Sequence, residues 1–84
     1  MTWWVYIMQC KDHTLYAGVT TDLERRLNEH NGEGPTAVKG AKYTRVRRPV
    51  KIVYTEICEN RSAACKREAA IKKLTRASKL KLIN

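Results

Sequence analysis

The sequence predicts an α+β domain built in the order strand, strand, helix, strand, helix, helix. Two apolar runs rich in aromatic and β-branched residues, 3–8 and 14–19, are separated by five polar residues, which is typical of a β-hairpin. A similar run at 50–57 predicts a third strand. Two further segments, 22–30 and 62–74, carry the spacing and the terminal signals of helices.

The length and composition of the chain limit what it can be. Eighty-four residues are enough for one domain, 1–84, with one modest core, so a surface cleft is a more natural substrate site than a deep cavity. The N-terminus has no apolar run long enough for a signal peptide or a membrane span, and a soluble cytoplasmic protein is expected. Three cysteines without CxxC spacing favour buried free thiols over disulfides or zinc: Cys10, Cys58 and Cys65.

The charge is distributed unevenly along the chain. Residues 1–38 carry three basic and five acidic side chains, whereas residues 39–84 carry fourteen basic and three acidic ones. The two halves therefore have net charges of −2 and +11, which sum to the overall +9. Such asymmetry indicates a polyanion partner, most simply nucleic acid. The alternative is a surface that lysines merely keep solvated.

The hairpin is expected to have one apolar and one aromatic face. Symmetric pairing would place Tyr6 opposite Tyr16, with Trp4 opposite Gly18, which leaves open space beside the two tyrosine hydroxyls. A cross-strand tyrosine pair is also common packing, so the pair alone does not establish a site. The other face is wholly apolar and is expected to be core: Trp3, Val5, Ile7, Leu15, Ala17 and Val19.

The next segment has the signals of a short helix. The stretch "TDLE" predicts a capping box, with Thr21 as N-cap and Glu24 reaching back from position N3. The helix is expected to end near His30, because Asn31 and Gly32 follow.

The phase of this helix separates its two arginines. Leu23 and Leu27 define the buried stripe at 100° per residue, and Arg26 and His30 flank it on one side. Arg25 points in nearly the opposite direction, into solvent. Arg26 and His30 are therefore expected to face the edge of the sheet, near the two tyrosines.

Residues 32–49 read as a long loop, because they hold three glycines and both prolines. Loops of this length in a compact domain are usually functional. Its second half combines basic residues with an aromatic one, a mixture suited to a phosphate backbone and to stacking. The candidate nucleic-acid-binding residues are Lys39, Lys42, Tyr43, Arg45, Arg47 and Arg48.

A carboxylate lies on the apolar side of the helix predicted from Ser62. Glu68 falls in the sector of Ala64, Cys65 and Ile71 and is the only acid after Glu59. The simple interpretation is an i, i+4 pair with Lys72, worth about 0.3–0.5 kcal/mol. An ion pair with Lys72 does not require Glu68 to lie on the buried side of the helix. The more informative hypothesis is that Glu68 binds a divalent cation or orients a partner.

The chain ends in "RASKLKLI", which predicts a short helix. Leu80 and Ile83 are expected to be buried there, and Lys79 and Lys81 to stay in water.

Taken in order, these segments resemble the GIY-YIG nuclease domain. The resemblance rests on "WVY" at 4–6, "YAG" at 16–18, "DLERRLNEHN" at 22–31 and the glutamate at 68. The runs "GAKYTRVRRPVKIVY" and "IKKLTRASKLKLI" are similar to small single-domain bacterial members of the family, so the likeness covers essentially the whole chain. It implies a three-stranded antiparallel sheet flanked by helices, and metal-dependent cleavage of DNA phosphodiester bonds.

The resemblance also implies roles for individual residues. Tyr6 and Tyr16 correspond to the motif tyrosines, Arg26 to the motif arginine and His30 to the histidine that often follows it. Glu68 corresponds to the metal-binding glutamate, with Mg²⁺ or Mn²⁺ as the ion, and no organic cofactor is implied. Whether a tyrosine or His30 deprotonates the water stays open, because an unperturbed tyrosine is only about 0.1% ionised at pH 7.

The sequence departs from the family pattern at two positions and leaves three functions open. Trp4 and Ala17 stand where the family has glycine and isoleucine, and neither position supplies a reacting group. The first hypothesis is a structure-selective or weakly specific DNA endonuclease in repair or recombination. The second is a nucleic-acid-binding module with little cleavage, and the third is an interaction subunit with an acidic protein partner. The oligomeric state is open.

Overall fold

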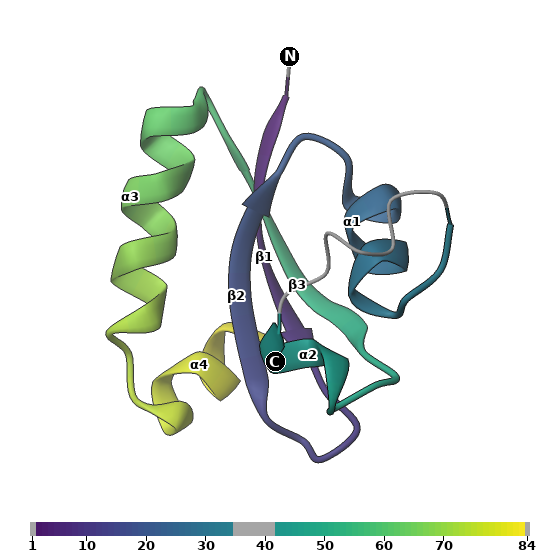
Figure 1. Cartoon of the computed structure of the whole chain (residues 1–84). Helices are drawn as coiled ribbons and strands as arrows, with labels where there is room; N and C mark the ends of the chain where they lie inside the picture. The colour runs from purple at the N-terminus through teal and green to yellow at the C-terminus, as the bar shows by residue number, and fades with distance from the viewer. Residues whose placement is uncertain (1, 35–41, 84) are drawn as a thin grey trace.

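The computed structural model describes residues 2–34 and 42–83 and confirms the α+β fold. One antiparallel sheet has the strand order β2-β1-β3, with α3 on one side and α1 on the other (Figure 1). No helix in the described part is long and apolar enough to cross a membrane. The elements are β1 (Trp3–Gln9), β2 (Leu15–Thr20), α1 (Leu23–His30), α2 (Lys42–Arg45), β3 (Lys51–Cys58), α3 (Arg61–Lys72) and α4 (Arg76–Ile83).

The central strand β1 sends alternate side chains into two separate clusters. The first cluster lies under α3 and is apolar, as predicted: Val5, Ile7, Ala17, Ala64 and Ile71. The second cluster lies on the opposite face, where Leu23 and Leu27 of α1 pack against it: Tyr6, Met8, Cys10 and Val50. The tyrosine face of the hairpin is therefore buried as well.

The predicted pairing of the hairpin is wrong by two residues. Tyr6 lies opposite Gly18, and Tyr16 lies opposite Met8. A shift of two residues leaves every side chain on its predicted face, because side chains alternate with a period of two. It changes the neighbours, however: a Cβ atom at Gly18 would overlap the hydroxyl of Tyr6. The absence of a side chain at Gly18 thus leaves the room that the Tyr6 ring occupies.

The turn between β1 and β2 explains the shift. The amide of Cys10 donates to the carbonyl of Thr14, so only three residues lie outside the ladder, fewer than predicted. His13 adopts a φ of 66°, and one carboxylate oxygen of Asp12 accepts from both the amide and the hydroxyl of Thr14. This side-chain turn tightens the loop, so β1 extends by one residue to Gln9 and β2 begins one residue later than predicted, at Leu15.

The helix α1 begins one residue later than predicted. Asp22, not Thr21, is the N-cap, and its carboxylate accepts from the amide of Arg25 at 3.0 Å. With this cap Glu24 stands at position N2, not at the N3 position of a capping box. The end of the helix at His30 is as predicted.

Three other predictions need correction. The region 32–49 is not all loop, because Lys42–Arg45 form the single-turn helix α2. Helix α3 begins at Arg61, with Asn60 as N-cap. The three cysteines are free, but only Cys10 is buried: Cys58 is half-buried and Cys65 is exposed. On α3 the buried positions are Ala64 and Ile71, and Cys65 is turned away from them.

Candidate active site

Tyr6 lies at the centre of a buried hydrogen-bonded network. Its hydroxyl is 3.2 Å from Nε2 of His30 and accepts from Nε of Arg26 at 3.4 Å. The residue is 1% exposed, because it lies in the second cluster between β2 and α1. Tyr6 is thus brought together with Arg26 and His30 of α1 as predicted, but Tyr6 and His30 are buried away from bulk water.

The structure confirms the phase of the two arginines on α1. The side chain of Arg26 is 24% exposed and points toward Tyr6, whereas that of Arg25 is 55% exposed. Arg26 can therefore donate to Tyr6 through Nε while part of its side chain stays exposed to solvent.

A buried carboxylate that the sequence did not reveal holds Arg26 in place. Glu29 accepts from Nη1 of Arg26 at 2.9 Å, and its other oxygen is 3.8 Å from Nε of Arg25. Its position three residues after Arg26 on the same helix was the available signal. Glu29 is nearly inaccessible to solvent. A buried ion pair of this kind fixes the orientation of the guanidinium.

His30 is fully buried and makes a hydrogen bond with each ring nitrogen. Its Nδ1 is 2.7 Å from the hydroxyl of Thr44 on α2, and its Nε2 faces Tyr6. Burial, assisted by the nearby charge of Arg26, lowers the pKa of His30 to about 4. The imidazole is therefore neutral at physiological pH.

The protonation state of Tyr6 completes the network. Burial raises the pKa of Tyr6, and the opposing effect of Arg26 is smaller. The hydroxyl therefore keeps its proton at neutral pH, and among the described residues Nε2 of His30 is its hydrogen-bond acceptor. The arrangement assigns the proton of the imidazole to Nδ1, which then donates to Thr44.

Tyr16 lies beside this network, not within it. Its half-buried ring contacts that of His30 edge-on, with centroids 5.3 Å apart, and stacks on Tyr43 at 5.7 Å. The ammonium of Lys72 is 5.9 Å from the centre of the same ring. Tyr16 thus joins the buried network to α2 and α3.

Glu68 approaches the site from α3. Its carboxylate is half-buried and lies 3.6 Å from the ammonium of Lys72, so the simple i, i+4 pair is present. The same ammonium is 5.9 Å from the centre of the Tyr16 ring, so the carboxylate lies near the tyrosines of the site. The described residues contain no group of three or more His, Cys, Asp or Glu side chains that could enclose a metal. A lone carboxylate suits Mg²⁺, which is commonly bound through one or two carboxylates, water and substrate phosphates.

The basic residues predicted to contact DNA have mixed environments. Lys39 and the side chain of Lys42 lie outside the described part, and Arg45 is exposed. Arg47 is 3.2 Å from the carboxylate of Asp12, and its guanidinium lies 4.1 Å from the centre of the Tyr43 ring. Arg48 donates to the carbonyl of His30 at 2.7 Å. These last two arginines make contacts that brace the loop, so their role in DNA binding stays a prediction.

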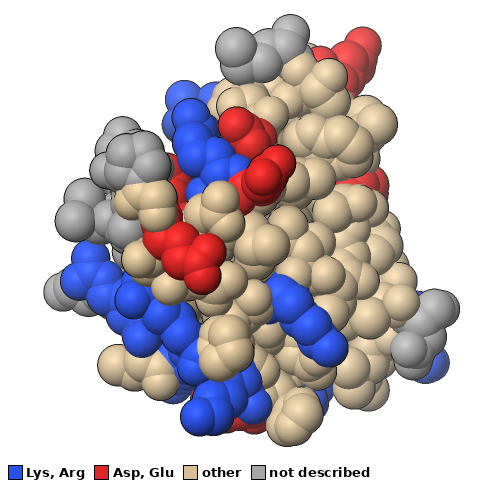
Figure 2. All heavy atoms as spheres, turned by 90° about the vertical axis from the view of Figure 1, so that its right-hand side faces the viewer, with Lys and Arg blue, Asp and Glu red and all other residues tan. Residues whose placement is uncertain are grey.

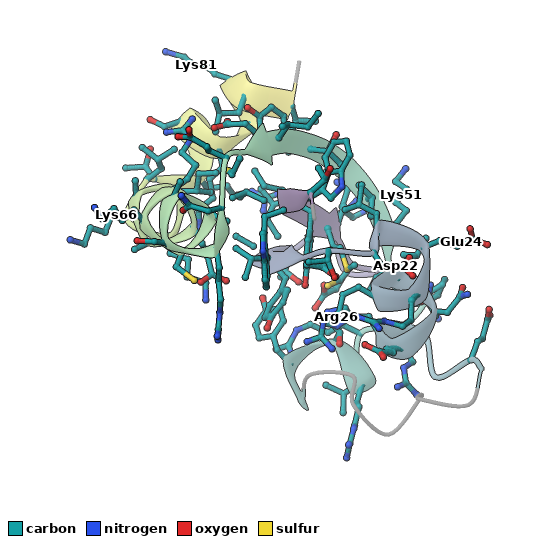
Figure 3. The ribbon with its side chains drawn as sticks, turned by 90° about the horizontal axis from the view of Figure 1, so that it is seen from above. Asp22, Glu24, Arg26, Lys51, Lys66 and Lys81 are labelled. Atoms are coloured by element: carbon teal, nitrogen blue, oxygen red, sulfur yellow. The ribbon has the colours of Figure 1, made fainter. Side chains whose placement is uncertain are left out.

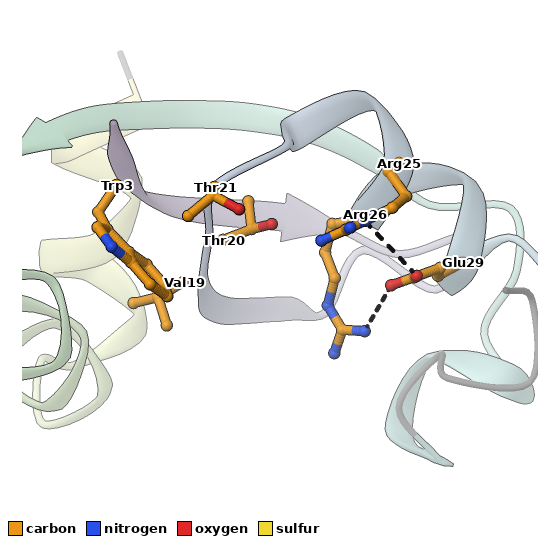
Figure 4. Close-up of a pocket in the computed structure, with 7 residues that line it drawn as sticks. All are labelled: Trp3, Val19, Thr20, Thr21, Arg25, Arg26 and Glu29. Atoms are coloured by element: carbon orange, nitrogen blue, oxygen red, sulfur yellow. Dashed lines mark hydrogen bonds and ion pairs between the residues drawn. The ribbon is translucent and has the colours of Figure 1, made fainter. Parts of the chain in front are cut away.

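A cleft of about 300 Å³ opens beside Arg26, where β2 ends (Figure 4). The figure shows Arg25 and Arg26 joined to Glu29 on one side, with Thr20 and Thr21 between them and Trp3. Hydroxyls and a guanidinium at one opening are suitable donors for an anionic ligand.

Comparison with known proteins places this chain in a family. A family model described as the GIY-YIG catalytic domain matches residues 2–81, and the chain belongs to this family. A UPF0213 protein from Desulfotalea psychrophila is 54% identical over 81 residues, covering 96% of this chain and 70% of the relative. Another from Syntrophus aciditrophicus is 52% identical over 80 residues, covering 95% and 87%.

Two solved structures support the fold. The solution structure of a UPF0213 protein from Bacillus halodurans matches with a TM-score of 0.59 and 40% identity, covering 99% of this chain and 83% of the other. That of a protein from E. faecalis matches with a TM-score of 0.61 and 49% identity, covering 94% and 79%. The chain is therefore similar to UPF0213 proteins, and the resemblance to the GIY-YIG domain is confirmed.

Proposed function

We propose that the protein is a metal-dependent endonuclease that hydrolyses phosphodiester bonds in DNA. The observation that carries the proposal is Arg26, which Glu29 orients and which contacts Tyr6 while part of its guanidinium remains open to solvent. A guanidinium held in this way can bind a phosphate bidentately and stabilise the charge that develops during hydrolysis. A DNA substrate would place the activity in the cytoplasm.

In this proposal Tyr6 and His30 move the protons. Tyr6 takes a proton from the attacking water while its own hydroxyl proton passes to Nε2 of His30, 3.2 Å away. The resulting hydroxide attacks phosphorus, and the bond to the leaving oxygen breaks. The leaving oxygen takes a proton from solvent water, and the proton on His30 returns through Tyr6 to the hydroxide that this leaves, which restores the neutral pair. The neutral His30 is the suitable acceptor, and Thr44 holds its ring by accepting from Nδ1–H. Burial is the main cause of the low pKa of His30, and a phosphate on Arg26 would offset the smaller contribution of that cation.

Glu68 is the residue that would hold the divalent ion, Mg²⁺ or Mn²⁺. The ion would supply Lewis-acid stabilisation of the phosphate when bound. Because the described residues gather no group of three or more His, Cys, Asp or Glu side chains that could hold a metal, binding of metal and DNA is expected to be mutually dependent.

One observation favours a second candidate, a nucleic-acid-binding module with little cleavage. The hydroxyl of Tyr6 is enclosed by Arg26 and His30, and the residue is almost inaccessible. Cleavage requires that DNA draw Arg26 outward and admit water, whereas binding alone does not.

Cleavage of labelled DNAs at low salt separates the two candidates. The panel contains a single strand, a duplex, a flap, a splayed arm and a four-way junction, each with Mg²⁺ or Mn²⁺. Glu68→Gln is the test variant. Glu59→Gln, which removes the same charge from an exposed glutamate, is the matched control. Metal-dependent cutting that is lost only in Glu68→Gln supports the nuclease, and the preferred DNA would indicate a role in repair or recombination. Retention of DNA without cutting, in all three proteins, supports the binding module.

A further inference from the structure

The positive charge of the described structure is concentrated in the two C-terminal helices. Residues 61–83 carry eight basic side chains and one acidic one, Glu68, which is a net charge of +7. The basic ones are Arg61, Lys66, Arg67, Lys72, Lys73, Arg76, Lys79 and Lys81. The face that carries α1 instead mixes acidic and basic side chains (Figure 2). A polyanion is therefore expected to favour α3 and α4 over α1.

A cavity lies where α4 meets the hairpin. It has a volume of about 200 Å³, and its walls are Thr14, Leu15, Tyr43, Arg76 and Lys79. Arg76 and Lys79 are three residues apart on α4, so their side chains share a face of the helix. Thr14 adds a hydroxyl, and Tyr43 adds an aromatic wall. Cations, a hydroxyl and a ring are the groups that bind the backbone of a nucleic acid.

This cavity adjoins the candidate active site. Tyr43, which is 38% exposed, stacks on Tyr16, and Tyr16 contacts His30. The ring of Tyr43 thus lies between the cavity and Tyr16, which borders the candidate active site. The guanidinium of Arg47, 4.1 Å from the centre of the Tyr43 ring, helps to fix this wall.

The two cations are not explained by ion pairing. Within the described residues neither Arg76 nor Lys79 has a carboxylate within ion-pair distance, and α4 contains no acid. Lys79 is half-buried, contrary to the prediction that it stays in water, whereas Lys81 is exposed. A lysine and an arginine drawn to one cavity without a counter-charge repel each other, and a bound phosphate would relieve that repulsion.

We propose that Arg76 and Lys79 bind a backbone phosphate of the DNA at the start of β2 and anchor the DNA strand to one side of the active site. Tyr43 forms the wall of this phosphate site that faces the active site. The inference rests on the proposed function, because it takes DNA as the ligand. It assigns the main anchor to α4 and not to the loop that the sequence suggested.

The test measures binding of a fluorescein-labelled single-stranded oligonucleotide in EDTA, so that no cleavage interferes. The salt dependence of the affinity is compared for wild type, Arg76→Gln/Lys79→Gln and the matched pair Lys66→Gln/Lys81→Gln. Lys66 and Lys81 lie on the same two helices and project away from the body of the protein (Figure 3). Both double variants lose two charges, so only position distinguishes them.

Loss of one phosphate contact should reduce the log–log salt slope by about 0.7 for single-stranded DNA. At 0.1 M salt the affinity of Arg76→Gln/Lys79→Gln should then fall by about 5-fold, with the difference vanishing near 1 M. The control pair should lose less than half of that slope.

Equal loss of slope in both double variants would overturn the anchor while leaving the proposed function standing. So would a wild-type slope in Arg76→Gln/Lys79→Gln. A wild-type protein that neither retains nor cuts any DNA would overturn the proposed function and the anchor together. Thermal unfolding of each variant verifies that it is folded. The single variant Lys79→Arg, which keeps both positive charges, should bind with the wild-type affinity.

Discussion

The hydroxyl of Tyr6 lies 3.2 Å from Nε2 of His30, and both residues are closed to solvent. This contact makes the phenol and the imidazole one unit, since the raised pKa of Tyr6 and the lowered pKa of His30 keep both neutral. A proton can then pass from oxygen to nitrogen without a change in the total charge of the pair. His30 acts through Tyr6 and is a positioning and proton-accepting residue that does not contact the substrate.

Arg26 and Arg25 should differ sharply in their effect on cleavage. Arg26→Lys keeps the charge but loses the bidentate fork, and Arg26→Ala loses both, so single-turnover rates should fall by about 10²–10³-fold for alanine. Arg25→Ala should leave most of the activity, because its side chain faces solvent. Equal losses for Arg25→Ala and Arg26→Ala would show that the guanidinium oriented toward Tyr6 has no special role.

Glu29→Gln should reduce cleavage although Glu29 is not expected to touch DNA. The amide keeps the shape of the side chain but removes the charge that holds Nη1 of Arg26 at 2.9 Å. A loss of about 10–100-fold in the single-turnover rate is expected, as for a misplaced catalytic group. Glu33→Gln, an exposed acid in the segment that follows α1, is the control. If Glu29→Gln cuts at the wild-type rate, the ion pair is only structural.

Gly18→Ala should destabilise the domain and displace Tyr6. A Cβ atom at this position would overlap the hydroxyl end of the Tyr6 ring, and overpacking of this kind costs about 1–3 kcal/mol of unfolding free energy. Urea denaturation measures the cost. In a Tyr6→Leu background, where the end of the ring is gone, the same substitution should cost much less. An equal cost in both backgrounds would mean that the strand backbone, not Tyr6, demands glycine.

The stability of the protein should depend on pH through His30. Its pKa is about 4 in the fold and 6.5 when unfolded, so the unfolded chain binds the proton more readily between these values. The contribution of a neutral His30 is complete above pH 6.5 and is lost as the pH falls toward 4, by about 3 kcal/mol of unfolding free energy.

His30→Gln isolates this contribution. The difference in unfolding free energy between wild type and the variant should shrink by about 3 kcal/mol from pH 7 to pH 4. Carboxylates titrate in both proteins and cancel in the comparison. A difference that stays constant with pH would contradict the lowered pKa of His30.

The sequence was sufficient for the order of the elements and for the phase of α1, because both follow from local periodicity. The register of the hairpin was not predictable in the same way, since it depends on a turn in which Asp12 accepts twice from Thr14. The predicted faces of the two strands were nevertheless correct, because a register shift of two residues leaves each side chain on the same face of the sheet.

The buried polar network was only half predictable. Tyr6, Arg26 and His30 were identified from spacing and resemblance, but Thr44 was not, because it comes from a helix turn within a region that reads as loop. Arg47 and Arg48 looked like DNA contacts, yet Arg48 caps the carbonyl of His30. Sequence alone cannot tell a cation that faces solvent from one that closes a tertiary hydrogen bond.

Enclosing Tyr6 and His30 in the core also restricts how such a chain can change over evolutionary time. Loss of one partner leaves the polar group of the other buried without a hydrogen bond, which costs about 1–3 kcal/mol. Replacing both by apolar residues of similar shape can be nearly neutral, but it needs two changes at once. A descendant that no longer needs the chemistry would therefore tend to keep its signature residues, and their persistence in a relative is not by itself proof that the relative still cuts.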